Sequence, residues 1–328
     1  MIPVSVTGVK IVLRREERLV MRLEFRIFPV AATGPLVAAF IVASYSQATE
    51  SPPTPPPKRL LVIADHSTGN QTAHGASSHA VATIERLGRQ SGAYVATIRT
   101  DMTLVTKGEV WGKGDYAKGG PKASRAATLD HYDAVLFYTN GETDLSDAQK
   151  RDLLAFVHAD GKGFIGVHSA AATAYGWPEY GVMLGGVFDN HPWKVTAAQI
   201  IVERPDFPAM RGWSTGMTLT DEHYQMRAAP YSRGEVDVLA RLDPQSVDLG
   251  TPGVHRTDRD FPVAWIKRYG KGRVFYSGLG HTDESWDDPR VQSMFLEGIR
   301  WALGSGGGEV RPHPMSDAGQ RADMTEKR

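Results

Sequence analysis

Short apolar runs alternate with amphipathic segments through the first half of the chain, and this alternation limits the fold more than any other feature. Three runs, within 59–65, 133–139 and 163–168, stay apolar until a polar residue ends them, as buried parallel strands do. Segments with apolar side chains at helical spacing follow at 77–90 and from about residue 147. The pattern predicts an α/β fold: a doubly wound, mostly parallel sheet with helices on both faces.

The second half of the chain adds strands of a different kind. Residues 195–203 alternate as a half-buried strand does, and 261–279 reads as a β-hairpin closed by Gly270-Lys-Gly272. A last helix is expected at about 289–303, where apolar side chains again recur at helical spacing. We therefore expect β-hairpin elements added to the parallel sheet, and one folded domain over 59–304.

The first 58 residues do not resemble a folded domain. An uncharged stretch at 27–45 follows two arginines and precedes Ser46-Gln47-Ala48, the pattern of a secretory signal peptide cleaved after residue 48. Met21 offers an alternative translation start, and an uncleaved membrane anchor is the alternative to cleavage. Residues 49–58 form a Pro-rich linker, and 305–328 a polar tail expected to be disordered. The chain is thus expected to be exported, to the periplasm or the medium, with transient membrane contact only if the anchor is retained.

Composition excludes several classes of function. The absence of cysteine removes disulfides, thiolate zinc sites and cysteine nucleophiles together. Lysine and arginine number 37 and so do aspartate and glutamate, without the basic stripe that nucleic-acid binding requires. Nucleic acid is therefore not an expected partner, and the oligomeric state is left open.

Polar residues stand where several predicted strands end. Ligands of open α/β sheets bind beyond the carboxyl ends of the strands, which selects Asn140, His168 and His281. His168 stands where related folds place a nucleophile, and a histidine there could serve as a base, a ligand or an anion donor. The alternative for each is a packing or turn role.

The sequence Asp221-Glu-His-Tyr224 combines two carboxylates, an imidazole and a phenol. Glu222 is our candidate general acid or base, with His168 and His281 as the other catalytic candidates. The remaining candidates are expected to bind substrate: His74, Asn140, His191, Trp193, Asp221 and Tyr224. A capping or turn role is the alternative for the Asp-Glu pair.

No metal ligands are assigned from the sequence. The dispersed histidines, together with Asp221 and Glu222, are residue types that hold divalent metals, but none shows a ligand spacing such as His-x-x-x-His. The cofactor is therefore left unknown, with a divalent metal as an open alternative. Tryptophans lie in the loops around these positions, and their rings stack on sugars, which makes carbohydrate the expected ligand. These tryptophans are Trp177, Trp193, Trp213 and Trp286.

A series of motifs resembles the ThuA-like (trehalose utilisation) family, in the family's order and over about 59–304. The motifs are Gly163-Phe-Ile-Gly-Val-His-Ser-Ala170, Trp177-Pro-Glu-Tyr-Gly181, Gly185-Gly-Val-Phe-Asp-Asn-His-Pro192, Asp221-Glu-His-Tyr224, Val263-Ala-Trp265 and Gly270-Lys-Gly-Arg-Val-Phe-Tyr-Ser-Gly-Leu-Gly-His281. The resemblance implies a flavodoxin-like fold related to class I glutamine amidotransferases and a link to carbohydrate utilisation. The residues that match the family's recurrent polar positions are His74, His168, His191, Glu222 and His281. His223 departs from the usual Trp, Leu or Ile.

The amidotransferase kinship does not carry over its reaction, because glutamine hydrolysis needs a thiolate and this chain has none. Three functions stay open at this point. The first is an enzyme acting on a sugar or keto-sugar through a His/Glu cleft. The second is a non-catalytic carbohydrate-binding or accessory protein, and the third is a metal-dependent hydrolase.

Overall fold

The computed structural model describes residues 56–64, 74–110 and 127–315. The predicted signal peptide, most of the Pro-rich linker and residues 316–328 lie outside these ranges. Within them, every helix is too short or too polar to serve as a membrane span.

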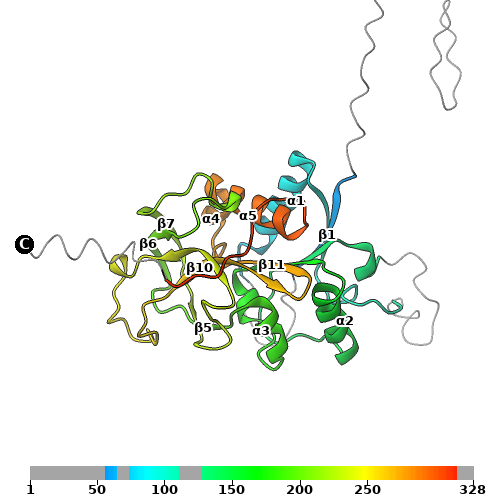
Figure 1. The fold of residues 1–328 in the computed structure, drawn as a ribbon, viewed down its shortest axis with the longest axis horizontal. Coiled ribbons are helices and arrows are strands. Elements are labelled where there is room, and N and C mark those ends of the chain that lie inside the picture. The colour runs from blue at the N-terminus through cyan, green and yellow to red at the C-terminus, as the bar shows by residue number, and fades with distance from the viewer. Residues whose placement is uncertain (1–55, 65–73, 111–126, 316–328) are drawn as a thin grey trace, which may run out of the picture. The chain divides into compact units, whose positions relative to one another are not determined.

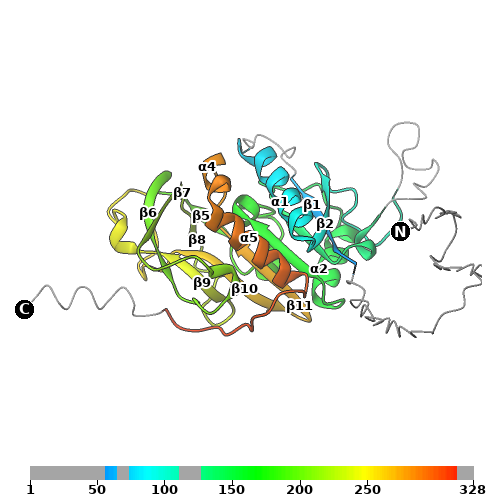
Figure 2. The same cartoon turned by 90° about the horizontal axis from the view of Figure 1, so that it is seen from above.

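A nine-stranded mixed sheet forms the centre of the fold (Figures 1 and 2). In their order across the sheet the strands are β2 (Tyr94–Arg99), β1 (Lys58–Ile63), β3 (Ala134–Phe137), β4 (Gly163–Val167), β11 (Gly272–Ser277), β10 (Pro262–Tyr269), β9 (Asp237–Leu242), β6 (Val195–Val202) and β7 (Met217–Glu222). The pairs from β2 to β11 are parallel, and the pairs from β11 to β7 are antiparallel. Seven of the nine strands therefore run in one direction, and only β10 and β6 run against them. The predicted α/β class and mostly parallel sheet are confirmed in this sense, and the order β2-β1-β3-β4 is that of flavodoxin-like folds.

Helices cover both faces of the parallel half (Figure 1). One face carries α1 (Ser77–Ser91), α4 (Asp283–Asp287) and α5 (Pro289–Ala302), and the other carries α2 (Asp147–His158) and α3 (Pro178–Leu184). Strands covered on both sides have no polar face, which is why every residue of β3 and β4 is buried. The helix predicted from Ser146 or Asp147 begins with a capping box between Ser146 and Gln149.

The hairpin predicted at 261–279 joins the two halves of the sheet. It forms β10 and β11, turning at Gly270, and β11 lies parallel to β4 while β10 lies antiparallel to β11. A small second sheet, β5 (Phe188–Asn190) with β8 (Gln225–Met226), was not predicted because its strands have three and two residues.

Residues 305–315, predicted as part of a disordered tail, are instead bonded to the domain. The indole of Trp301 donates to the carbonyl of Gly308 at 2.9 Å, and the amide of Arg311 donates to Asp237 at 2.6 Å. Nε2 of His313 lies 3.5 Å from Oδ1 of Asp237. The correction has a physical reason: the side chain of Asp237 is fully buried, and a buried carboxylate needs donors, which this segment supplies.

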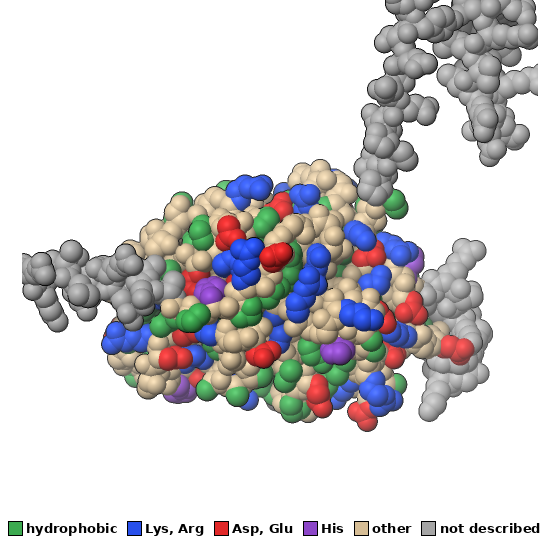
Figure 3. Space-filling view, viewed as in Figure 1, with side chains coloured by type: hydrophobic (Ala, Val, Ile, Leu, Met, Phe, Trp, Pro, Cys, Tyr) green, Lys and Arg blue, Asp and Glu red, His purple; other side chains and the backbone are tan. Residues whose placement is uncertain are grey.

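Charged side chains on the face drawn in Figure 3 are of both signs, with lysine and arginine interspersed among aspartate and glutamate. That face shows no basic stripe.

Candidate functional site

His168 follows the last residue of β4 and is held from both its backbone and its ring. Its φ of 44° lies in the left-handed region, and the hydroxyl of Tyr276 donates to its carbonyl at 2.8 Å. The ring Nδ1 lies 2.7 Å from the carbonyl oxygen of Gly278. Because a carbonyl only accepts, Nδ1 carries a proton, and Nε2 is the ring atom that faces the surrounding side chains.

Nε2 of His168 is the meeting point of three side chains. The hydroxyl of Tyr224 lies 2.8 Å away, Nδ1 of His281 3.1 Å away and Oε2 of Glu222 3.3 Å away. The His281 and Glu222 atoms are themselves 3.3 Å apart. The three predicted catalytic residues thus lie in direct contact, although they come from distant parts of the chain.

The sheet brings these residues together from unexpected positions. His168 and His281 follow the neighbouring parallel strands β4 and β11, so their proximity reflects the shared carboxyl edge. Glu222 ends β7, four strands beyond β11, which is about 19 Å away in a flat sheet. The contact therefore depends on the twist of the antiparallel half and on the path of the chain beyond β7 and β11.

Asp221 positions His281 rather than facing the cavity. Its side chain is fully buried and accepts the backbone amides of Gly280 at 2.7 Å and His281 at 3.1 Å. It also accepts the hydroxyl of Ser285 and the amide of Glu222, at 2.7 and 2.8 Å. The residue predicted to bind substrate is therefore placed to fix the loop between β11 and α4.

Electrostatics at the cluster keep Glu222 a carboxylate beside a neutral His281. Burial alone would raise the pKa of Glu222, but the neighbouring imidazoles, His168 first and then His281 and His191, bring it below its usual value. Burial lowers the pKa of His281, and it raises that of Tyr224. Near neutral pH the cluster thus holds a carboxylate, a neutral His281 and a protonated Tyr224.

A cavity of about 510 Å³ opens onto this cluster, within the range of small-molecule sites. Its lining residues are His74, Gly75, Asn140, Ala172, Tyr175, Phe188, His191, Glu222, Tyr224 and His281. His191 lies at its exposed side, with Nδ1 3.7 Å from Oε1 of Glu222. Tyr175 and Phe188 were missed: Phe188 lies in a motif we quoted for the family, and no sequence signal marks Tyr175.

The predicted tryptophans do not line this cavity. Trp177 and Trp213 are 6% exposed and Trp286 is fully buried, so all three pack in the core. The indole of Trp193 donates to the carbonyl of Asp248 at 2.8 Å, and its ring packs on Phe261. Large aromatic rings gain most from burial, which is the physical reason that their position in loops misled the prediction.

Four residues of the cluster are of the types that bind metals. Each of His74, His168, Glu222 and His281 offers one atom that could bind a metal ion, and these four atoms all lie within 4.8 Å of one another. His223 points elsewhere, with Nε2 donating to the carbonyl of Thr196 at 3.2 Å, although its neighbours Glu222 and Tyr224 both face the cluster.

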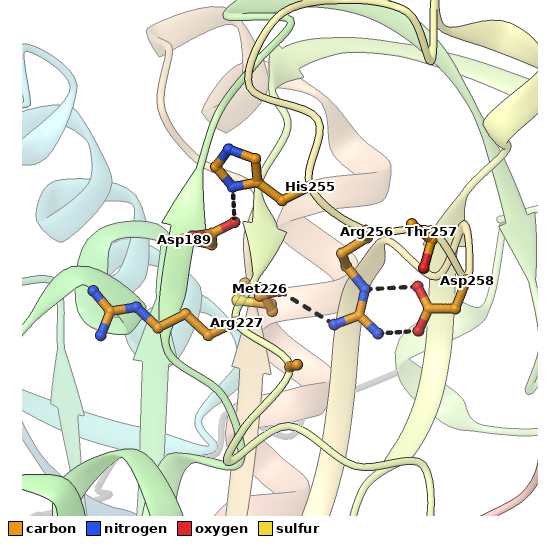
Figure 4. A pocket seen from close by; sticks show the side chains of 8 residues that line it. Asp189, Met226, Arg227, His255, Arg256, Thr257 and Asp258 are labelled. Carbon is orange, nitrogen blue, oxygen red and sulfur yellow. Dashed lines mark hydrogen bonds and ion pairs between the residues drawn. The ribbon is translucent and has the colours of Figure 1, made fainter.

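A second cavity, of about 390 Å³, lies beside β5 and β8 (Figure 4). Its charged side chains mostly pair with one another: His255 with Asp189 at 2.7 Å, and Arg256 with Asp258. Charges already neutralised within the chain offer less to a ligand than the His168 cluster does, so the first cavity is the candidate site.

Residues 59–302 match the ThuA family, described as trehalose utilisation. The chain belongs to the ThuA family. This places it in the context of carbohydrate utilisation and in the glutamine amidotransferase-like fold. No match was found among the curated proteins.

Two solved ThuA-like structures share the fold. A ThuA-like protein of Bacteroides uniformis has a TM-score of 0.59 at 21% identity, covering 77% of this chain and 94% of its own. One from Parabacteroides merdae has a TM-score of 0.57 at 16% identity, covering 77% and 92%. At these identities the likeness is one of fold.

Proposed function

We propose that this ThuA-family protein is an enzyme of carbohydrate utilisation that acts on a sugar or keto-sugar derivative. The observation that carries the proposal is the contact among His168, Glu222 and His281, whose facing atoms lie 3.1 to 3.3 Å apart beside a cavity. Binding needs no such convergence of a buried carboxylate and two imidazoles, whereas proton transfer and stabilisation of a substrate oxygen do.

The cavity lining supports a carbohydrate as the substrate class. The rings of Tyr175 and Phe188 offer apolar surfaces to the faces of a sugar, while Asn140 and His191 offer hydrogen bonds to its hydroxyls. The family's link to trehalose utilisation points the same way.

The test is turnover of disaccharides and their 3-keto forms, followed by product analysis. We expect His168→Ala and Glu222→Gln each to lower the rate by about 10²–10⁴-fold, the range for loss of a proton-transfer group. His131→Ala and Glu85→Gln are matched controls, because their side chains are outside the cavity lining. Unchanged rates in both site variants would remove the cluster from the reaction.

The aromatic lining also supports a second candidate, a non-catalytic carbohydrate-binding protein. Tyr175 and Phe188 would supply its affinity, and the histidines would only hydrogen-bond hydroxyls. Calorimetry separates the two candidates: binding heat with no product after long incubation favours the binding protein.

We also propose that the protein is exported. The uncharged stretch at 27–45, two arginines before it and the small residues at 46–48 support this. Mass analysis of the protein from separated cell fractions tests it. A mature amino terminus at residue 49 outside the cytoplasm is expected, and an intact chain confined to the cytoplasm contradicts it.

A further inference from the structure

We propose that His168, Glu222 and His281 bind a divalent transition metal ion of the zinc class. The inference deepens the proposed function, because it assigns the chemistry of the same cluster. It depends on where the lone pairs point, on the spacing of the three atoms and on how rigidly they are held.

The facing atoms of the three side chains can all give a lone pair to a cation. Nδ1 of His168 donates to the carbonyl of Gly278, so Nε2 is the ring atom that can bind a cation, and it lies 3.3 Å from the carboxylate Oε2 of Glu222. Two acceptors at that distance repel unless a hydrogen or a cation lies near both. In the absence of a metal, the hydroxyl of Tyr224 and Nδ1 of His281 can supply that hydrogen, and a cation can take its place. Among the described residues, Glu222 forms ion pairs with imidazoles only. No lysine or arginine of that part of the chain supplies that cation.

The spacing matches the coordination sphere of a small ion. A triangle with sides of 3.1, 3.3 and 3.3 Å has a circumscribed radius of about 1.9 Å. A point about 2.0–2.1 Å from all three atoms, the usual Zn–N and Zn–O distance, therefore lies within about 1 Å of their plane. Tetrahedral ligands at that distance are about 3.3 Å apart, close to the spacing observed.

The chemical types of the three ligand atoms indicate which metal would bind. Two imidazole nitrogens and one carboxylate oxygen suit zinc and its neighbours, whereas magnesium and calcium prefer oxygen donors. Three protein ligands leave a fourth position for water or a substrate oxygen, as in catalytic zinc sites. His74, whose donor atom lies within 4.8 Å of the others, is near enough to influence that position.

Neighbouring groups fix each ligand in place. Gly278 sets the tautomer of His168, and Tyr276 holds its backbone. Asp221 binds the amides of Gly280 and His281. The carbonyl of Gly280 also accepts from Tyr138 at 2.7 Å and from Trp286 at 2.9 Å. Such outer contacts orient metal ligands and are costly to remove.

The test measures metal directly. The full chain, purified without chelator, is analysed for metal content and then titrated with zinc after chelator treatment, with Co²⁺ as a spectroscopic probe. We expect about one ion per chain and tetrahedral Co²⁺ absorption. Loss of an outer contact costs 10–100-fold in affinity, so His281→Ala and Glu222→Gln should each cost more than about a hundredfold.

Controls separate loss of the site from loss of the fold. His168 is buried and has a positive φ, so the test leaves it unchanged and uses His281, whose side chain is more exposed, and Glu222. Circular dichroism checks that His281→Ala and Glu222→Gln stay folded. His131→Ala should bind like the parent chain. Equal zinc affinity in His281→Ala, Glu222→Gln and the parent, or a folded parent that binds none of zinc, cobalt, manganese or iron(II), overturns the metal site.

The two proposals fail differently. Turnover of a sugar by chelator-treated protein that also binds no ion in the titration would overturn the metal site and leave the proposed function intact. Zinc bound at the cluster with no sugar converted would leave the site intact and contradict the proposed function.

Discussion

Replacing Asp221 with asparagine should destabilise the fold and loosen the loop that carries His281. The carboxylate is fully buried and accepts four hydrogen bonds, two at each oxygen. Asparagine keeps one acceptor oxygen and turns an amino group toward the donors on the other side. If that side is Oδ2, Ser285 can rotate its hydroxyl to accept, but the amide of Gly280 then faces another donor.

The number of hydrogen bonds disrupted sets the expected loss in stability. At least one buried backbone donor loses its partner, at about 1–3 kcal/mol, and the remaining bonds lose their charge-assisted strength. We therefore expect Asp221→Asn to lower the free energy of unfolding by about 2–4 kcal/mol. Urea denaturation followed by circular dichroism measures this change, provided the slope with denaturant stays constant.

Asp248→Asn is the matched control. Asp248 is exposed, and its side chain accepts one backbone amide, that of Gly250, at 2.8 Å. Water can replace that bond, so its loss should cost less than about 1 kcal/mol. If Asp221→Asn were as mild as this control, the idea that Asp221 fixes the β11–α4 loop would be refuted.

Three further predictions concern the support of His168, pH and the cavity lining. Tyr276→Phe removes the buried hydroxyl that donates to the carbonyl of His168, and thermal melting should show a loss of about 1–2 kcal/mol; an unchanged midpoint would contradict this. Burial would raise the pKa of Asp260, but Arg233 brings it below its usual value, so the stability that this carboxylate adds is complete above about pH 5 and is lost at lower pH. The destabilisation by Asp260→Asn, followed by urea denaturation at several pH values, should therefore shrink below about pH 4, and a constant difference would contradict it. Calorimetry should show sugar affinity reduced about two- to tenfold by Tyr175→Ala and unaffected by Trp193→Ala; the opposite order would show that the cavity is not the sugar site.

The parallel half of the fold was predictable because its strands are buried on both faces. Burial on both sides leaves continuous apolar sequence in β3 and β4, and the glycines at 270 and 272 mark the hairpin turn. The strand β9 was not predicted, although all of its residues are buried, because Asp237 and Arg241 interrupt its apolar sequence. Partners outside the strand neutralise both charges: Arg204 pairs with Asp237, and Glu203 with Arg241 at 2.6 Å.

Only two kinds of sequence evidence could predict the candidate site: the positions where strands end and the chemical types of the residues there. His168 and His281 follow adjacent parallel strands, so the rule that ligands lie at the carboxyl edge selected them. The same rule cannot reach Glu222, which comes from the antiparallel edge. The roles of Asp221 and Glu222 could not be separated by type, because direction alone distinguishes them: one side chain faces the loop backbone and the other faces His168.

The backbone of His168 indicates how the position that holds a nucleophile in related folds is used in this chain, which has no thiol. Its positive φ directly after a buried strand is the strained turn that presents a nucleophile in related folds. Here the ring is bonded at Nδ1 to Gly278, and its one remaining atom, Nε2, is surrounded by Tyr224, His281 and Glu222. A nucleophile needs open space in front of its reacting atom. Nε2 of His168 instead faces a hydroxyl, a second imidazole and a carboxylate. The turn that elsewhere exposes a reacting atom therefore directs Nε2 of His168 into the cluster in this chain, where the proposed metal ion would bind it.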